Sequence, residues 1–380
     1  MAKLGELYKI TSGGTPSRNH SEYYEDGTIP WVKTGDLKDK YLFETDEKIS
    51  QLGLENSSAR IYLKNTVLLA MYGATIGATS ILKTDAATNQ ACAAFSPRED
   101  ILPEYLYAFL ESKKDRFTKD AVGGAQPNLS AGYLKNIEFD YPSLEQQTKI
   151  TRTLNQIDEL LFLRKKQLEK LDELVKARFV EMFGDPVNNP TNYPKSQLGK
   201  VCDVRDGTHD SPEYYDVGYP LVTSKNVTGG KIDLSECNLI SEDDYKKICE
   251  RSKVDRGDII MPMIGTVGKP VIVNAEPTFA IKNVALIKFT PDSLVTNIYI
   301  KTLLESDYFD RAVLNKIRGG TQKFIALGDI RKLEIILPDL KHQQCFSSFV
   351  EHIDEQKQTV QQSLEKLKLM KKVLMQEYFG

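Results

Sequence analysis

The stretch LEQQTKITRTLNQIDELLFLRKKQLEKLDELVKARFVEMFG, residues 144–184, decides the organisation of this chain. Its apolar residues recur at steps of three and four, the pattern of a helix that packs along another helix. The final stretch, LKHQQCFSSFVEHIDEQKQTVQQSLEKLKLMKKVLMQEYFG, residues 340–380, repeats this period and ending, with an offset of 379 − 183 = 196. The two stretches therefore predict two long helices that pair. The apolar residues predicted to pack between them are Leu154, Ile157, Leu161, Leu168, Leu171, Val175, Val350, Ile353, Val360, Leu364, Leu367 and Leu374.

Basic residues interrupt both apolar seams at complementary places. Each interruption is matched by an apolar residue at the corresponding position of the other stretch. At 1.5 Å per residue, a helix of about 39 residues would extend roughly 58 Å, which is long for a globular protein. The pattern predicts a paired, antiparallel, rod-like spacer. The interrupting residues are Arg164, Arg178, Lys357 and Lys371.

The repeat extends beyond the helices. TSGGTPSRNHSEYYEDG (11–27) resembles RDGTHDSPEYYDVG (205–218), and MYGATIGATSIL (71–82) resembles MIGTVGKPVIV (263–273). Short β-rich runs alternate with Gly, Asn and Pro turns, and a few segments have helical spacing. We therefore predict an α+β fold with an internal repeat, in which two similar globular domains are separated by two long antiparallel coiled-coil helices. The predicted boundaries are 1–143 and 185–340 for the globular domains, and 144–184 and 341–380 for the helices.

Composition is that of an ordinary soluble protein of more than one domain. The chain has 380 residues, 41% hydrophobic and 27% charged, with a formal net charge of −3. Its start, MAKLGELYKI, has no apolar segment typical of a secretory signal, and no apolar run approaches the roughly 20 residues that span a bilayer. The five cysteines are scattered and form no C-x-x-C pair, which favours reduced thiols. We expect a cytoplasmic protein of a bacterium or archaeon, with no membrane partner.

Catalytic motifs are missing from the sequence. It contains no [DN]-P-P-[YF] motif of adenine methylation, no Gly-rich cofactor loop after a strand, no P-loop and no G-x-S-x-G elbow. Pro338-Asp339 and Glu355-Gln356-Lys357 fit a loose nuclease pattern by letters, but the second part lies inside the predicted helix and cannot converge on the aspartate to bind Mg²⁺. We predict no catalytic residues, no metal ligands and no cofactor in this chain.

Several loops occur once in each copy and carry groups that can contact DNA. Their amides can read adenine, and their Lys and Arg side chains can contact phosphates or guanine. Any one of these loops could instead be a structural turn. A basic face on the helices is more typical of a solvated coiled-coil flank than of a DNA track. The candidate DNA-binding residues are Thr15, Ser17, Arg18, Lys33, Thr34, Tyr72, Thr75, Asn89, Gln90, Gln126, Asn128, Arg205, Thr208, His209, Lys225, Asn226, Thr266, Lys282, Asn283, Arg318, Thr321, Gln322 and Lys323.

IPWVKTGDL (29–37), GATIG (73–77), NQA (89–91) and the PSLEQQ start of a long helix that ends in FGDP resemble the specificity subunit of type I restriction–modification systems. The resemblance covers the whole chain. The second copy departs from the first, with YPLVTSKNV (219–227) and IKNVAL (281–286) at the corresponding places. Such divergence is expected if the two domains read different sequences.

The resemblance implies that two target recognition domains each read one half of an asymmetric bipartite site in double-stranded DNA. The helices would set the gap between the half-sites and dock two modification subunits, which carry S-adenosylmethionine and methylate adenine N6. Restriction subunits would join with ATP and Mg²⁺, and this chain would carry no catalysis itself. Two other classes stay open at this point: a coiled-coil scaffold that binds only proteins, and an unrecognised nuclease or transferase.

Overall fold

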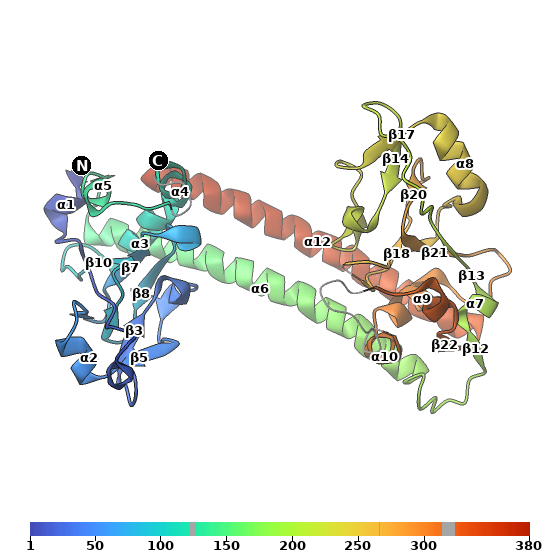
Figure 1. The fold of residues 1–380 in the computed structure, drawn as a ribbon, viewed down its shortest axis with the longest axis horizontal. Helices are drawn as coiled ribbons and strands as arrows, with labels where there is room; N and C mark the ends of the chain where they lie inside the picture. The colour runs from blue at the N-terminus through green and yellow to red at the C-terminus, as the bar shows by residue number, and fades with distance from the viewer. Residues whose placement is uncertain (122–126, 266, 314–323) are drawn as a thin grey trace. The chain divides into compact units, whose positions relative to one another are not determined.

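Figure 1 shows the fold of a computed structural model, which describes residues 1–121, 127–265, 267–313 and 324–380. The chain divides into two compact units. Unit 1 comprises Met1–Lys165 with Gln362–Gly380, and unit 2 comprises Lys166–Gln361. Each unit contains one globular domain and part of each long helix, because α6 (Leu144–Phe183) and α12 (Leu340–Phe379) both cross the division.

The globular domain of unit 1 contains two main sheets and short helices. Helix α3 (Pro103–Ser112) lies against strands β7 (Val67–Ala70) and β8 (Thr79–Leu82) and covers the larger sheet. The larger sheet has the order β2 (Thr11–Ser12), β10 (Cys92–Phe95), β7 (Val67–Ala70), β8 (Thr79–Leu82) and β4 (Tyr41–Leu42). The second has the order β5 (Glu47–Ile49), β3 (Ile29–Val32), β9 (Ala86–Thr88) and β6 (Ile61–Tyr62), and β1 (Ala2–Lys3) pairs with β11 (Glu138–Phe139). The helices are α1 (Leu4–Leu7), α2 (Gln51–Glu55), α3 (Pro103–Ser112), α4 (Lys114–Asp120) and α5 (Ala131–Lys135).

The globular domain of unit 2 repeats this plan. Its larger sheet has the order β13 (Asp203–Asp206), β21 (Val284–Lys288), β18 (Ile259–Pro262) and β19 (Val271–Ile272). A second sheet has the order β17 (Asn238–Ile240), β14 (Tyr219–Val222) and β20 (Ala280–Ile281). Two further sheets have two strands each: β12 (Lys195–Gln197) pairs with β22 (Glu334–Ile336), and β15 (Val227–Thr228) pairs with β16 (Lys231–Ile232). The helices are α7 (Leu198–Val201), α8 (Glu242–Ser252), α9 (Asn297–Leu304), α10 (Asp307–Ala312) and α11 (Leu327–Arg331).

Strand register confirms the internal repeat at the level of single residues. In unit 1 the parallel strands β3 and β9 pair Val32 with Thr88, and in unit 2 the parallel strands β14 and β20 pair Val222 with Ile281. The offsets are 222 − 32 = 190 and 281 − 88 = 193, both smaller than the 196 of the long helices. Insertions and deletions within the globular domains account for this drift.

Buried aromatic rings join the end of each long helix to a globular core. In unit 2, Phe183 near the end of α6 lies 5.1 Å from Tyr299 and 5.4 Å from Phe346, measured between ring centroids. In unit 1, Phe379 at the end of α12 lies 5.3 Å from Tyr105. Since Phe183 is fully buried and Phe379 is 6% exposed, the helix ends belong to the domain cores. Burying such rings is a large stabilising contribution.

The two long helices pack against each other in an antiparallel manner within each unit. In unit 1, Lys371 forms an ion pair with Asp158, and in unit 2, Lys357 Nζ lies 2.6 Å from Asp172 Oδ1. The sums 158 + 371 and 172 + 357 are both 529, so one antiparallel register describes both pairs. The two lysines that interrupt the second seam therefore reach acidic partners on the facing helix. The predicted pairing residues are all buried or half-buried.

One glutamine of each QQ motif, Gln147 or Gln343, anchors a long helix to its domain. Gln147 is fully buried, accepts a hydrogen bond from Leu102 N at 2.9 Å, and donates to the carbonyl oxygens of Asp100 and Pro142. In the same way, Gln343 accepts from Thr296 N and donates to two main-chain oxygens. Because buried main-chain groups need partners, the motif anchors the helix start as well as marking it.

We expect Gln147→Ala to destabilise unit 1 by roughly 2–4 kcal/mol, because it leaves one main-chain N–H and two carbonyls without partners. The matched control is Gln146→Ala, since the Gln146 side chain is exposed and we expect a change within about 0.5 kcal/mol. Trp31 is the only tryptophan and lies in unit 1, so its fluorescence during urea unfolding measures the effect. Equal midpoints for the two variants would contradict the anchoring role.

Candidate nucleic-acid interface

Three loops of the first domain meet at the carboxyl ends of the parallel strands β3 and β9. The loop after β2 crosses close to β9, since a Cβ on Gly13 would lie 1.9 Å from Thr88 O. Gly14 N donates to Thr88 O at 2.9 Å, and Trp31 Nε1 donates to Gly14 O at 3.1 Å. Only glycine allows this approach, which brings the following polar residues beside the ends of both strands.

Polar side chains from these loops contact one another. Thr15 Oγ1 donates to Gln90 Oε1 at 2.5 Å. Arg18 Nη2 lies 2.6 Å and Lys33 Nζ 2.5 Å from the two carboxylate oxygens of Glu47 on β5. The structure thus brings together four residues that the sequence predicts as DNA contacts, and places one carboxylate among them. We call Thr15, Arg18, Lys33, Glu47 and Gln90 the first-domain cluster.

Aromatic rings and turn contacts hold the cluster in shape. The Arg18 guanidinium lies 4.2 Å from the centroid of the Tyr24 ring and 5.3 Å from that of Trp31, a cation–π arrangement. Asn89 Oδ1 accepts from Ala91 N, so this amide shapes its own loop. Two further predicted residues lie at the surface of these loops, Ser17 exposed and Thr34 half-exposed.

A second group of predicted residues adjoins the first-domain cluster. Met71 N donates to Ala91 O at 2.8 Å, so the turn that begins at Tyr72 lies beside the Gln90 loop. Tyr72 is 42% exposed and forms a bridge with Asn128, which is also exposed. Thr75 Oγ1 donates to Tyr72 O. The predicted contact surface therefore continues from the loops after β2 and β9 onto the turn between β7 and β8.

The second domain places different side chains at the same backbone positions. A Cβ on Gly207 would lie 2.3 Å from Ile281 O, the counterpart of the close approach in the first domain. His209 Nδ1 then lies 2.7 Å from Asn283 Oδ1, and His209 Nε2 lies 2.8 Å from Asp206 Oδ2. His209 corresponds to Thr15 and Asn283 to Gln90, with offsets of 194 and 193. We call Asp206, His209, Arg251, Lys282 and Asn283 the second-domain cluster.

The remaining predicted residues of the second domain divide into exposed and structural ones. Thr208 forms a bridge with Lys282, whose Nζ donates to Ser211 Oγ at 2.6 Å, and Lys225 is exposed. Asn226 is only 8% exposed, and its Oδ1 accepts from the main-chain N–H and the hydroxyl of Thr223. A buried turn residue cannot reach a DNA base, so we leave Asn226 out of the proposed surface.

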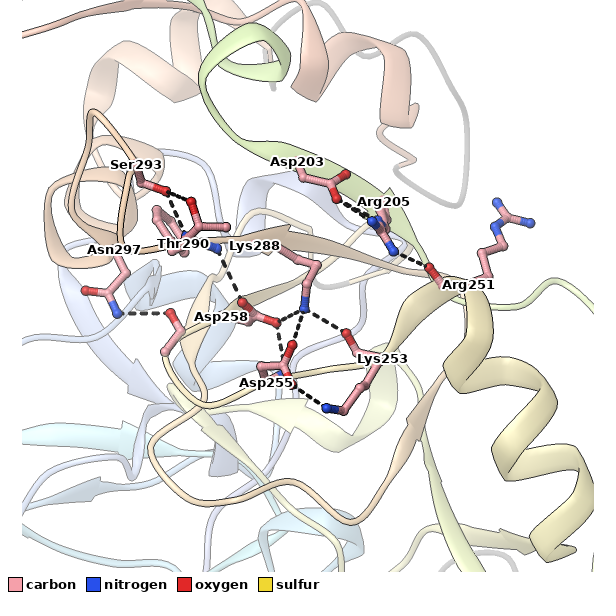
Figure 2. A network of polar contacts seen from close by, with 12 residues as sticks. Asp203, Arg205, Arg251, Lys253, Asp255, Asp258, Lys288, Thr290, Ser293 and Asn297 are labelled. Carbon is pink, nitrogen blue, oxygen red and sulfur yellow. Dashed lines mark hydrogen bonds and ion pairs between the residues drawn. The ribbon is translucent and has the colours of Figure 1, made fainter.

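Arg205 also has a structural role. Figure 2 shows its guanidinium reaching Asp203 and the main-chain oxygen of Arg251, at the end of α8. Nearby, Lys288 Nζ contacts Asp255, Asp258 and the carbonyl oxygen of Lys253 (Figure 2). These cations bind carbonyls at the carboxyl end of α8, where positive charge is favourable. We therefore leave Arg205 out of the proposed surface as well.

Some predicted DNA contacts cannot be placed. They belong to the loops rich in glycine, threonine and glutamine of both copies. They are Gln126, Thr266, Arg318, Thr321, Gln322 and Lys323, and they lie outside the described residues.

Electrostatics favours the charged form of His209. Hydrogen bonds with Asn283 and then with Asp206 raise its pKa above the usual value. When the ring is protonated, Nδ1–H donates to Asn283 and Nε2–H donates to Asp206, so both neighbours are satisfied at once. The second-domain cluster thus holds a histidine whose charged form is favoured, and this charge is lost only as pH rises through the raised pKa.

A family profile described as "Type I restriction modification DNA specificity domain" matches residues 1–173 and 190–369, once in each half of the chain. The chain belongs to this family. It is therefore a specificity subunit of a type I restriction–modification system. The match in both halves agrees with the internal repeat, and family membership implies a role in DNA target recognition.

Individual relatives and solved structures agree with this assignment. The chain is 28% identical to the MjaIX specificity subunit of Methanocaldococcus jannaschii, over 93% of this chain and 86% of that one. It is 23% identical to the MjaVIII specificity subunit of the same organism, over 99% and 90% of the two chains. A chain from a solved type I restriction–modification system matches the fold with a TM-score of 0.65 at 18% identity, covering 100% of this chain and 96% of that chain. The specificity subunit from M. genitalium matches with a TM-score of 0.57 at 14% identity, covering 100% and 95%.

Specificity subunits are non-catalytic parts of type I enzymes, which agrees with the predicted lack of a catalytic site. Among the described residues, no group of three or more His, Cys, Asp and Glu side chains could hold a metal ion. The described helices also include none that is both long and apolar enough to cross a bilayer.

Three residues of the two clusters are not among the DNA-binding residues predicted from the sequence of this specificity subunit. Glu47, Asp206 and Arg251 each form an ion pair with another cluster residue. Glu47 and Arg251 are far in sequence from the loops they contact, and no motif marks either one. Asp206 lies inside the quoted stretch RDGTHDSPEYYDVG (205–218) and could have been found there.

Proposed function

We propose that each globular domain reads one half of an asymmetric bipartite site in double-stranded DNA. One observation supports this most strongly: the contacting pairs Thr15–Gln90 and His209–Asn283 stand at corresponding backbone positions of the two domains but carry different side chains. Thr15 and Gln90 in one domain are replaced by His209 and Asn283 in the other. The same scaffold with different hydrogen-bonding groups suits two different base sequences.

The chemistry of the cluster side chains suits the major groove. A glutamine or asparagine amide can bond adenine in a bidentate manner, and an arginine can do the same with guanine. Each domain offers one such amide in its cluster, Gln90 or Asn283, beside a lysine side chain, Lys33 or Lys282. Because the whole chain has a net charge of −3, we propose that partner subunits supply much of the phosphate contact.

We further propose that the paired helices set the gap between the half-sites and dock two modification subunits. Exposed apolar side chains on the helices of unit 1 support a protein partner there, since patches of this kind mark interaction sites. Those partners would bring S-adenosylmethionine for methylation of adenine N6, and restriction subunits would bring ATP and Mg²⁺. The exposed apolar residues are Leu160, Phe162, Leu163, Leu369, Met370 and Val373.

The experiment that tests this proposal is DNA binding by the chain co-purified with its modification subunits. Affinity for a duplex should fall steeply as salt rises, because phosphate contacts release counterions. A protein-only scaffold would show no salt-dependent DNA binding in any complex. Such a result with a folded complex would overturn the proposal.

Affinity for the half-site of the second domain is expected to fall as pH rises through the raised pKa of His209. Below that pKa the ring carries a positive charge that attracts the negatively charged DNA, and above it the charge is lost. An attraction of about 1.4 kcal/mol corresponds to roughly tenfold in affinity. Fluorescence anisotropy between pH 6 and 8.5 would measure this, and His209→Gln should remove the dependence. An unchanged pH profile in that variant would contradict the assignment.

A further inference from the structure

In the first-domain cluster, a single carboxylate lies between two predicted DNA-binding cations. The two Glu47 oxygens are divided between Arg18 and Lys33, at 2.6 and 2.5 Å. The side chain of Glu47 is 31% exposed, so the group is partly shielded from water. The hydrogen bond from Lys33 lowers the pKa of Glu47, which keeps the carboxylate ionised at neutral pH. One of the two positive charges is thereby neutralised before any DNA arrives.

The second-domain cluster has the same arrangement built from other residues. Asp206 contacts His209 Nε2 at 2.8 Å with one oxygen and the Arg251 guanidinium with the other. Its side chain is only 12% exposed. Again one carboxylate is shared by two groups that would otherwise be free to bind phosphate.

The shared fold does not require either carboxylate. Strand register places Glu47 opposite Trp31, and the corresponding pair in the second domain is Asn238 opposite Leu221. Asp206 pairs with Ala285, whose counterpart Ala93 pairs with Ser12. Each domain thus places a carboxylate between two cationic groups, but the carboxylate comes from β5 in the first domain and from β13 in the second. Because the two carboxylates do not stand at corresponding positions, their shared arrangement with cations indicates a role in binding and not in the fold.

We infer that Glu47 and Asp206 determine specificity by withholding the cluster cations from phosphates and leaving them available to base edges. This inference rests on the proposed function. Cation–phosphate contacts are independent of sequence, so each one strengthens binding to every DNA. A fixed carboxylate repels phosphate and restrains Arg18 and Lys33. The guanidinium still has N–H groups beyond those facing Glu47, and neutral base acceptors can use them.

The test compares Glu47→Gln with Glu44→Gln in the complex with modification subunits. Both variants remove one negative charge, but Glu44 is exposed and forms no ion pair in the part of the chain that the structure describes. The probes are a duplex with the mapped site and a duplex in which the half-site of the first domain is scrambled. We expect Glu47→Gln to bind the scrambled duplex more tightly and to lose about tenfold in discrimination between the duplexes. Its slope of log affinity against log salt should steepen by about 1, the value for one added phosphate contact.

Asp206→Asn, with exposed Asp216→Asn as its control, repeats the test in the second domain. Thermal unfolding shows whether each variant is folded. If Asp206→Asn does not fold, the comparison of Glu47→Gln with Glu44→Gln still decides the test. If the wild-type complex discriminates and Glu47→Gln behaves like Glu44→Gln, the inference is wrong while the proposed function stands. A loss of affinity for both duplexes without a steeper salt slope also overturns it. If the wild-type complex itself does not discriminate, the proposed function fails.

Discussion

Adding one heptad to both long helices is expected to lengthen the unspecified run between the two half-sites by about three base pairs. Seven helical residues add roughly 10.5 Å, and B-DNA rises about 3.4 Å per base pair. Because paired residue numbers sum to 529, insertions after Lys165 and after Ser363 lie opposite each other and preserve the pairing. Mapping N6-methyladenine in cells that express the variant would show both half-sequences unchanged and a longer gap.

The control for this prediction is the same heptad inserted in α6 alone. That insertion shifts one helix past the other, so it places Asp158 out of reach of Lys371 or Asp172 out of reach of Lys357. We expect it to abolish methylation. If the double insertion methylates DNA with the original gap, the helices do not set the spacing.

Gln90→Ala is expected to relax recognition at one half-site and leave the other unchanged, and Asn283→Ala should do the reverse. The two residues stand at corresponding positions, and each amide contacts the neighbouring loop of its own domain. One bidentate contact to a base is worth about 1–3 kcal/mol, or roughly 5- to 150-fold in discrimination. Binding to duplexes with either half-site scrambled measures the two effects separately.

Each variant serves as the control for the other, because both remove an amide of the same kind from the same place in the fold. Loss at both half-sites with either variant would contradict the assignment of one domain to one half-site. Unfolding midpoints within about 0.5 kcal/mol of wild type would show that the effect concerns binding.

Much of the architecture could be predicted because hydrophobic periodicity directly reflects helix packing. The heptad pattern gave both long helices and their pairing, and the repeated motifs gave two domains of one plan. The contacts of the four basic residues that interrupt the apolar seams were harder to predict. Lys357 and Lys371 are ion-paired across the helices, and a partner on another element cannot be read from spacing alone. For the same reason, spacing alone did not reveal that Gln147 and Gln343 anchor the starts of the long helices.

The candidate site was predicted less completely, because its residue types also serve as turn residues. Asn226 has the right chemistry for a base contact, yet it caps its own loop and is buried. Glu47 has no motif around it, and only the pairing of β5 with β3 brings it to Arg18 and Lys33. Long-range strand pairing of this kind depends on the whole domain, and a local pattern does not reveal it.

The most direct test of the account is to co-express the chain with its modification subunit and map N6-methyladenine across the host genome at single-base resolution. We predict one bipartite motif, two short defined blocks separated by a fixed run of unspecified bases. Methylation at a single continuous motif, or no sequence-dependent methylation from a folded complex with an active modification subunit, would contradict the claim that two domains read two half-sites.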